Sequence, residues 1–183
     1  MAQYALGDVA AFERLYARHE MRLWRYLLRH VFDPALADDL SQEVWFAVAR
    51  QAQRYEARDN AKFSTWLFTL AHHRMVDSHR SKQRGHVSLD AETGDDDESL
   101  QESLPADEQS GPLAQIESRE QARALLAAIE QLPPEQREAF LLQAEGGMEV
   151  IDIAQATGVS FETAKSRLRY ARSKLRQCLQ EYA

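Results

Sequence analysis

The chain has 183 residues, 44% of them apolar, which is enough for one or two small packed domains. A single cysteine excludes a disulfide scaffold, and the sequence has neither a signal-peptide pattern nor a long apolar run, so we expect a cytoplasmic protein without membrane insertion. The formal charge of −7 is unevenly spread. Residues 1–84 hold 13 Lys/Arg and 10 Asp/Glu. Residues 85–111 hold nine Asp/Glu and no Lys or Arg, and residues 112–183 hold nine Lys/Arg and ten Asp/Glu. The acidic middle therefore masks locally basic surfaces, and a nucleic-acid binder is not excluded.

The first two helices are predicted from apolar spacing and from their boundaries. Apolar and aromatic residues recur at three- and four-residue steps after Gly7-Asp8, from Phe12 to His30. Asp33-Pro34 ends this helix and begins another, because proline suits the first helical position. The second helix runs to about Tyr55. Five of its residues share the predicted core face: Ala37, Leu40, Val44, Ala47 and Val48.

The other side of this second helix carries polar and aromatic residues. Asp38, Gln42 and Trp45 lie there, with Phe46 close by. Large aromatic residues off the core face favour a surface for a partner protein. The alternative is that another helix of the same domain covers them, as in any small bundle.

A third helix is predicted from Phe63, after a polar loop. Its core face holds Phe63, Leu67, Leu70 and Ala71, and a second stripe beside it holds Trp66, Thr69, His73, Val76, Asp77 and Arg80. Aromatic rings beside cations suit unpaired DNA, because bases stack on the rings while cations follow the phosphates, although an aromatic-rich helix is also typical of a core.

A metal site is the other interpretation of this helix, and we do not expect one. His73 and Asp77 are one turn apart, but no third ligand shares their face, even with His72 and His79 nearby. No phosphate loop, nucleophile motif or paired carboxylate pocket is recognisable elsewhere. The sequence therefore predicts no cofactor, no metal and no enzyme.

Residues 85–111 differ from both flanks. Asp95–Glu98 lie among Ser, Gly, Gln and Pro with few branched or aromatic residues, which predicts a flexible acidic linker. A helix over residues 113–131 follows. Another begins at Pro133-Pro134 and ends at Gly146-Gly147, with Phe140, Leu141 and Ala144 facing inward.

Residues 150–177 predict a helix-turn-helix. Val150, Ile153 and Ala154 share one face of its first helix, Gly158 supplies the turn and Ser160 is a suitable N-cap. The seam of the second helix is formed by Ala164, Leu168, Ala171, Leu175 and Cys178.

The outer face of that second helix is polar and basic. Glu162, Ser166, Arg169 and Ser173 lie on it, flanked by Thr163, Lys165, Tyr170 and Arg172, and residues 159–176 hold six Lys or Arg and one acid. Such a helix can read base edges in the major groove while its cations hold phosphates. A solvated basic surface helix is the alternative.

The amino-acid sequence of this region resembles that of the C-terminal domain of bacterial extracytoplasmic-function (ECF) sigma factors, group 4 of the sigma-70 family. The shared landmarks are Leu132-Pro133, Gln136-Arg137, Leu141-Leu142, Glu145-Gly146, Ile153-Ala154, Gly158-Val159-Ser160 and Thr163–Leu168. Ala164 replaces a usual valine at a buried position, and Met148–Val150 replace a frequent Leu-Ser-Tyr. Neither change touches the DNA-facing side.

Two N-terminal stretches resemble the same family. Ala37–Trp45 is similar to the segment that docks on a clamp helix of the largest subunit of RNA polymerase. Residues 62–84 are similar to the region that opens the promoter and reads the melted strand. Thr69 replaces a frequent arginine and His73 a frequent asparagine, which leaves the melted sequence open.

The resemblance implies an all-α protein of two small helical domains joined by a flexible acidic linker: residues 1–84 like region 2, residues 85–111 the linker, and residues 112–183 like region 4. It implies a sigma factor that binds core RNA polymerase, recognises and melts promoter DNA, and can meet an anti-sigma protein. The alternative is a stand-alone helix-turn-helix regulator with an N-terminal sensing domain.

The resemblance and the residue patterns together give three sets of expected site residues. Core polymerase would meet Asp38, Asp39, Gln42, Glu43, Trp45 and Phe46. The proximal, single-stranded promoter element would meet Lys62, Phe63, Trp66, Thr69, His73, Asp77 and Arg80. The distal duplex element would meet Ser160, Glu162, Thr163, Lys165, Ser166, Arg167, Arg169, Tyr170, Arg172 and Ser173.

Overall fold

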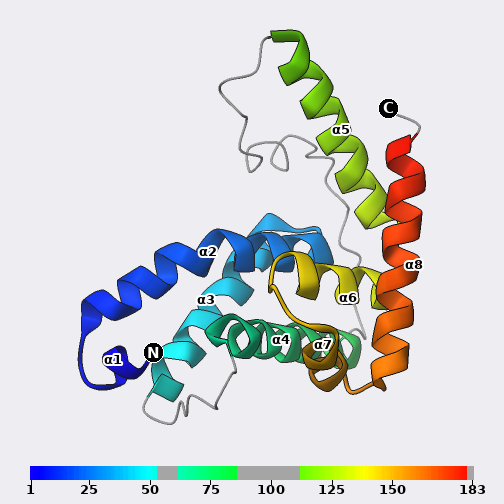
Figure 1. The fold of residues 1–183 in the computed structure, drawn as a ribbon. Coiled ribbons are helices and arrows are strands. Elements are labelled where there is room, and N and C mark those ends of the chain that lie inside the picture. Colours follow the sequence, from blue (N-terminus) through cyan, green and yellow to red (C-terminus); the bar gives the residue numbers. More distant parts are fainter. Residues whose placement is uncertain (53–61, 86–111, 181–183) are drawn as a thin grey trace. The chain divides into compact units, whose positions relative to one another are not determined.

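A computed structural model describes residues 1–52, 62–85 and 112–180, and these residues form eight helices and no strand (Figure 1). The helices are α1 (Ala2–Ala5), α2 (Val9–Val31), α3 (Pro34–Gln51), α4 (Phe63–Gly85), α5 (Pro112–Glu130), α6 (Pro134–Ala144), α7 (Val150–Thr157) and α8 (Phe161–Gln180). The all-helical prediction is confirmed. The predicted linker lies outside the described residues, except for Gly85, where α4 ends.

Side-chain caps fix where α2 and α3 begin. A carboxylate oxygen of Asp8 accepts the N–H of Ala11 at 3.1 Å, and Asp33 accepts the N–H of Leu36 at 3.1 Å, so each aspartate binds an amide that the first turn leaves unpaired. Both starts were predicted. Helix α3 is described as far as Gln51, and the expected end near Tyr55 lies outside the described residues. The four-residue α1 was not predicted at all.

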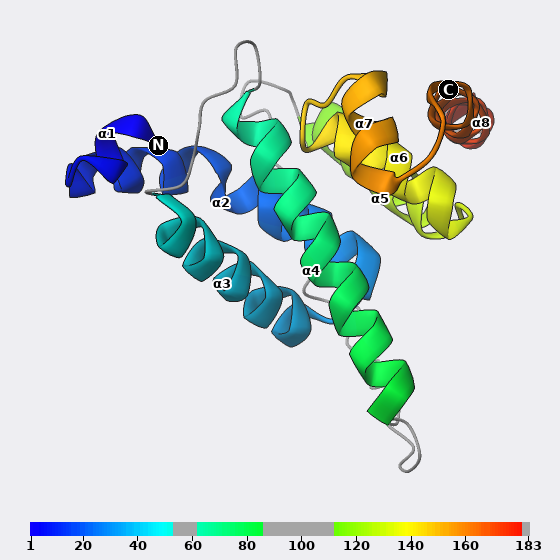
Figure 2. The same cartoon turned by 90° about the horizontal axis from the view of Figure 1, so that it is seen from below.

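Helices α2, α3 and α4 share one hydrophobic core. Figure 2 shows α4 crossing α2 and running beside α3. All five core residues predicted for α3 are buried, and Tyr26 of α2 meets Phe68 of α4 edge to face, with ring centroids 5.4 Å apart. Two core residues of α4, Phe68 and Met75, were missed, whereas Phe63 and Leu70, predicted to be core, are only half-buried.

The chain falls into two compact units. The first combines Met1–Ser88 with Leu141–Lys165, and the second combines Leu89–Phe140 with Ser166–Ala183. The predicted domain limits of 1–84, 85–111 and 112–183 stay a prediction. No helix in the described parts of the chain is long and apolar enough to cross a lipid bilayer.

Within the first unit, residues 145–148 form a tight turn between α6 and α7. Gly146 has no room for a side chain, because a Cβ atom would lie 2.5 Å from the carbonyl oxygen of Leu142 and 3.1 Å from Cγ of Phe68 in α4. Gly147 has a φ of +64°, which favours glycine. The predicted helix stop at these glycines is confirmed. Ala144, predicted to face inward, is exposed, and Leu142 and Met148 are buried instead.

In the second unit, α5, α6 and the later part of α8 line a shallow apolar hollow. Its volume is about 560 Å³, and its apolar walls come from Leu125, Phe140, Leu175 and Leu179. The predicted seam of α8 is confirmed at four positions, because Ala164, Leu168, Ala171 and Leu175 are at most 4% exposed. The fifth seam residue, Cys178, is only half-buried.

Candidate nucleic-acid and partner interfaces

The outer face of α8 begins at a well-formed cap. Gly158 adopts a φ of +68° and ends α7, and the Ser160 hydroxyl accepts the N–H of Thr163 at 3.1 Å, which starts α8 as predicted. Seven of the expected duplex-contacting residues are exposed: Ser160, Glu162, Lys165, Arg169, Tyr170, Arg172 and Ser173. The other three are half-buried: Thr163, Ser166 and Arg167.

Two cations on this face, Lys165 and Arg169, make exposed contacts with neighbouring side chains. Lys165 lies 3.8 Å from Glu162 and 5.9 Å from the centre of the Phe161 ring. Arg169 stacks on the ring of Tyr170 at 5.0 Å. Exposed pairs of this kind contribute about 0–1 kcal/mol, so a phosphate can displace them at little cost.

A second surface lies on α3, where four predicted residues follow each other at the i, i+3, i+4 and i+7 spacing of one helix face. They are Asp39, Gln42, Glu43 and Phe46; all are exposed, and Phe46 is 63% exposed. Asp38 is also exposed, and its Oδ1 accepts a hydrogen bond from Nε1 of Trp24 in α2 at 2.6 Å. Trp24 fixes the orientation of this carboxylate and was not predicted from the sequence.

Trp45 does not belong to this surface. It is only 6% exposed, and its ring packs against Phe12 at 5.8 Å and against Tyr16 at 4.9 Å, both in α2. The prediction that Trp45 points outward is therefore wrong, and the alternative of cover by a helix of the same domain is right. The physical reason is that α3 packs against both α2 and α4, which widens its buried arc.

The third surface is the stripe on α4. Four of its expected residues are exposed, Lys62, His73, Asp77 and Arg80, and three are half-buried, Phe63, Trp66 and Thr69. The Phe63 ring lies between His19 and Trp66, at 5.3 and 5.8 Å. The Thr69 hydroxyl donates to the carbonyl oxygen of Thr65 at 2.8 Å, so this side chain is directed back along its own helix.

His19 lies under the aromatic end of this stripe. It is 8% exposed, and its Nδ1 atom has no hydrogen-bond partner. Burial lowers the pKa of its imidazole, and the nearby charges of Arg22 and Arg18 lower it further. Among the residues with described positions, no three His, Cys, Asp or Glu side chains gather as metal ligands would.

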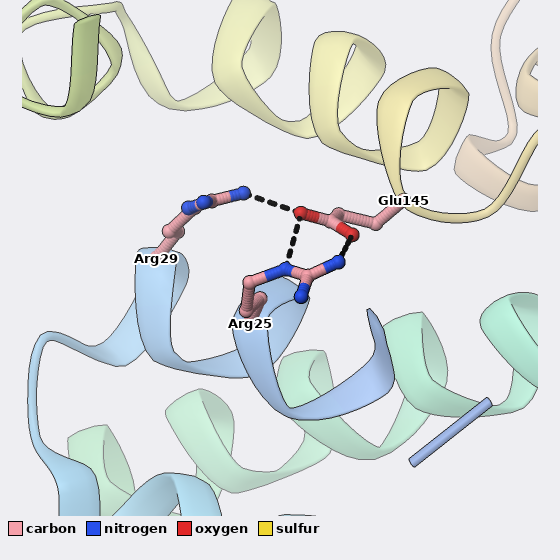
Figure 3. A network of polar contacts seen from close by, with 3 residues as sticks. All are labelled: Arg25, Arg29 and Glu145. Carbon is pink, nitrogen blue, oxygen red and sulfur yellow. Dashed lines mark hydrogen bonds and ion pairs between the residues drawn. The ribbon is translucent and has the colours of Figure 1, made fainter. Parts of the chain in front are cut away.

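A charged network in the first unit was also missed at the sequence level. Arg25 donates from Nε and Nη2 to the two carboxylate oxygens of Glu145, at 3.1 and 3.0 Å, and Arg29 donates from Nη1 to Oε1 (Figure 3). Glu145 is 6% exposed. In the sequence, Glu145-Gly146 stands out only as a family landmark, because no local pattern indicates a contact more than a hundred residues away.

Two family models match the regions that carry these surfaces. Sigma-70 region 2 matches residues 15–85, which contain α4 and α3, and sigma-70 region 4 matches residues 122–175, which contain α6, α7 and most of α8.

Curated relatives match over nearly the whole chain. RNA polymerase sigma factor CarQ of Myxococcus xanthus is 32% identical over 190 residues, covering 99% of this chain and 96% of the relative. ECF RNA polymerase sigma factor SigK of Mycobacterium ulcerans is 27% identical over 179 residues, covering 98% of this chain and 91% of the relative.

Two solved structures share the fold. Sigma factor RpoE, crystallised with the anti-sigma factor NepR from Bartonella quintana, matches with a TM-score of 0.68 at 22% identity, over 94% of this chain and 98% of its own. CnrH, in complex with the cytosolic domain of CnrY, matches with a TM-score of 0.62 at 23% identity, covering 100% of this chain and 96% of its own.

These matches do not favour a stand-alone regulator, since region 2 stands where a sensing domain would be required. The chain belongs to the ECF branch of the sigma-70 family, and it is a non-catalytic factor that binds core RNA polymerase and promoter DNA and directs promoter-specific initiation of transcription.

Proposed function

We propose that the three surfaces divide the work of a sigma factor. The outer face of α3 (Asp38, Asp39, Gln42, Glu43 and Phe46) binds core polymerase, the stripe of α4 holds the melted strand of the proximal element, and the outer face of α8 reads the distal duplex. The observation that carries this proposal is the face of α3. It exposes three carboxylates, an amide and the aromatic residue Phe46, which is 63% exposed, on a helix whose other face packs against α2 and α4.

An exposed aromatic side chain surrounded by carboxylates is typical of a protein-binding surface. Aromatic side chains supply much of the binding energy at the centre of an interface, and charges around them speed association with an oppositely charged partner. The partner surface is therefore expected to be basic at its rim and apolar at its centre.

The test is a double substitution, Asp39→Ala with Phe46→Ala. Both side chains are exposed, so the fold should persist while affinity for core polymerase falls by at least tenfold. The matched control is Glu13→Ala with Met21→Ala, which removes an exposed acid and an exposed apolar side chain from α2. Equal affinity of both variants in a competition assay against a labelled sigma factor would refute the assignment.

On α4, a half-buried Trp66 beside exposed cations suits an unpaired strand. One edge of the ring packs within the domain, and the remaining surface can stack with a base. The exposed Lys62 and Arg80 lie at the two ends of the stripe and can meet successive phosphates. On α8, the exposed Lys165, Arg169 and Arg172 would hold phosphates, while Ser166 and Glu162 reach base edges.

We further propose that this factor acts in the cytoplasm, with domain limits at 1–84, 85–111 and 112–183, and that an anti-sigma protein regulates it. The support for regulation is that the fold is shared with RpoE, which was solved bound to an anti-sigma factor. Affinity purification from the source cells, followed by transcription assays with each captured protein, tests this; the expected partner inhibits transcription and competes with core polymerase.

A further inference from the structure

We propose that Arg25, Arg29 and Glu145 form a clasp that closes the free chain and opens on core polymerase. Glu145 belongs to the segment matched to region 4, and both arginines belong to the segment matched to region 2. The proposal rests on the proposed function in one respect, namely that polymerase holds the two DNA-reading regions at separate promoter elements. A closed clasp keeps the turn at residues 145–148 on α2 and is incompatible with that separation.

The geometry of the clasp is specific. Arg25 presents two donors in parallel to both oxygens of one carboxylate, and Arg29 donates to one of the same oxygens (Figure 3). Two-point pairing of a guanidinium and a carboxylate fixes the direction as well as the distance of a contact. The side chains are 24%, 16% and 8% exposed for Arg25, Arg29 and Glu145, so salt screens this contact less than the surface pairs.

The packing beside the clasp brings the two segments into direct contact. Gly146 follows Glu145, and a Cβ atom there would lie 3.1 Å from Phe68, a fully buried residue of α4. At Gly147, a Cβ atom would lie 3.7 Å from Nη2 of Arg22, one turn before Arg25 in α2. The turn therefore lies directly on α2 and α4. Gly146 permits the close approach to α4, whereas a Cβ atom at Gly147 would only make an ordinary contact with Arg22.

The charge balance makes the clasp reversible. One carboxylate serves two guanidinium groups, and burial lowers the pKa of Arg29 while Glu145 opposes that shift. Separated, all three charged groups regain water, which offsets much of the attraction lost. A purely apolar contact has no such compensation on opening, so a polar clasp suits a contact that must close in the free chain and open on a partner.

The direct test measures the distance between the two segments in the free, full-length chain. Nitroxide labels at Arg50→Cys in α3 and Gln155→Cys in α7 lie at exposed positions within the first unit, and Cys178→Ala removes the native thiol. Double electron–electron resonance should give one narrow distance distribution. Glu145→Gln should broaden it toward longer distances, while Glu13→Gln, the same change at an exposed site of α2, should leave it unchanged. A narrow, unshifted distribution in Glu145→Gln overturns the proposal.

A charge swap separates the clasp from a general effect on folding. Glu145→Arg alone should open the chain, and adding Arg29→Glu should close it again, because the double variant restores one acid between two cations. If circular dichroism shows that Glu145→Gln loses helix content, the charge-swap variant is used in its place to test the clasp. Recovery of the narrow distribution supports the clasp, and a distribution that stays broad in a folded double variant refutes it.

Addition of core polymerase to the labelled, otherwise unaltered chain then tests the release. The distance should lengthen on binding, and Glu145→Gln should bind core more tightly, by about tenfold if a tenth of the free chain is open. Bound chain that keeps the short distance overturns the release step. Failure of the chain to bind core at all would instead contradict the proposed function, and it would leave the narrow distribution of the free chain intact.

Discussion

The two helices proposed to contact DNA, α8 and α4, present their proposed binding residues in different ways. On α8, the seam residues Ala164, Leu168, Ala171 and Leu175 are at most 4% exposed, and they alternate with exposed side chains such as Lys165 and Arg169. On α4, Phe63 and Trp66 are half-buried and belong to a chain of ring contacts that reaches His19 inside the domain.

This difference determines which functions can be changed separately. On the proposed assignment, packing and DNA binding on α8 belong to different residues, so substitutions should affect either stability or DNA affinity. On α4, the same rings would contribute to both, and a loss of binding should be accompanied by a loss of stability. Helix α4 therefore offers fewer positions at which its DNA preference can change without a cost in stability.

The largest expected effect tests the separation on α8 with two adjacent residues. Leu168→Ala should lower the free energy of unfolding by about 2–5 kcal/mol, because Leu168 is 3% exposed and its removal leaves a cavity. Arg169→Ala should change stability by less than about 0.5 kcal/mol, while it weakens DNA binding and reduces the salt slope by about one phosphate contact. Urea denaturation and filter binding at several salt concentrations provide the two measurements. Equal losses of stability in Leu168→Ala and Arg169→Ala would contradict the separation of packing and DNA binding on α8.

The next effect distinguishes base reading from phosphate binding on the same helix. Ser166→Ala should reduce the preference for the correct base over the wrong base by about 1–3 kcal/mol. Lys165→Ala should weaken binding to specific and scrambled duplexes alike. The measurement compares affinities for both duplexes with each variant in holoenzyme. A uniform loss with Ser166→Ala would assign that residue to the phosphate backbone.

On α4, Trp66→Ala should show the combined effect. The loss of a half-buried ring should reduce the free energy of unfolding by about 1–2 kcal/mol, below the roughly 3–5 kcal/mol of a fully buried one, and promoter opening should fall more than closed-complex formation. The exposed His73→Ala should impair opening with little effect on stability. Permanganate reactivity of the melted strand and thermal denaturation provide the readouts. Normal opening in both variants would exclude α4 from strand capture.

The smallest expected effect is the pH dependence of stability that comes from His19, the buried residue against which Phe63 of α4 packs. The pKa of His19 is lowered in the folded state by burial, so the unfolded chain binds a proton more readily. The contribution of His19 to stability should therefore be complete above its unfolded pKa of about 6.5 and should decline as the pH falls below that value. His19→Gln should flatten the difference in unfolding free energy between pH 7 and pH 5. Identical pH profiles would mean that this histidine does not titrate differently in the two states.

Local patterns predicted most of the helices, because caps and apolar spacing are encoded within a few residues. Asp8, Asp33 and Ser160 each accept the amide expected of a cap, and the α8 seam follows its sequence period. Trp45 and Phe68 were misassigned because both lie in helices with two packing partners, where a single-face rule underestimates burial. The Arg25–Glu145 contact could not be predicted, since it depends on how distant segments meet.

Of the expected site residues, those on α8 could be placed from periodicity alone. Those on α3 depended on knowing which other helices cover it, and the resemblance to a family identified Asp39 and Glu43 but could not show that Trp45 was covered. Thr69 shows a third limit: its hydroxyl satisfies its own helix backbone, which a sequence cannot reveal.

The hydrogen bond between Trp24 and Asp38 gives the α3 face an intrinsic optical reporter. The indole N–H of Trp24 binds a carboxylate in the proposed polymerase-binding surface, whereas Trp45 is buried among rings and Trp66 lies on α4. Indole emission depends on its hydrogen bonding and on its exposure to water, so a partner that engages Asp38 should shift the fluorescence of Trp24 selectively. With Trp66→Phe, the remaining signal would come from the half-buried Trp24 and the buried Trp45, and docking on α3 could be followed in real time without an attached dye.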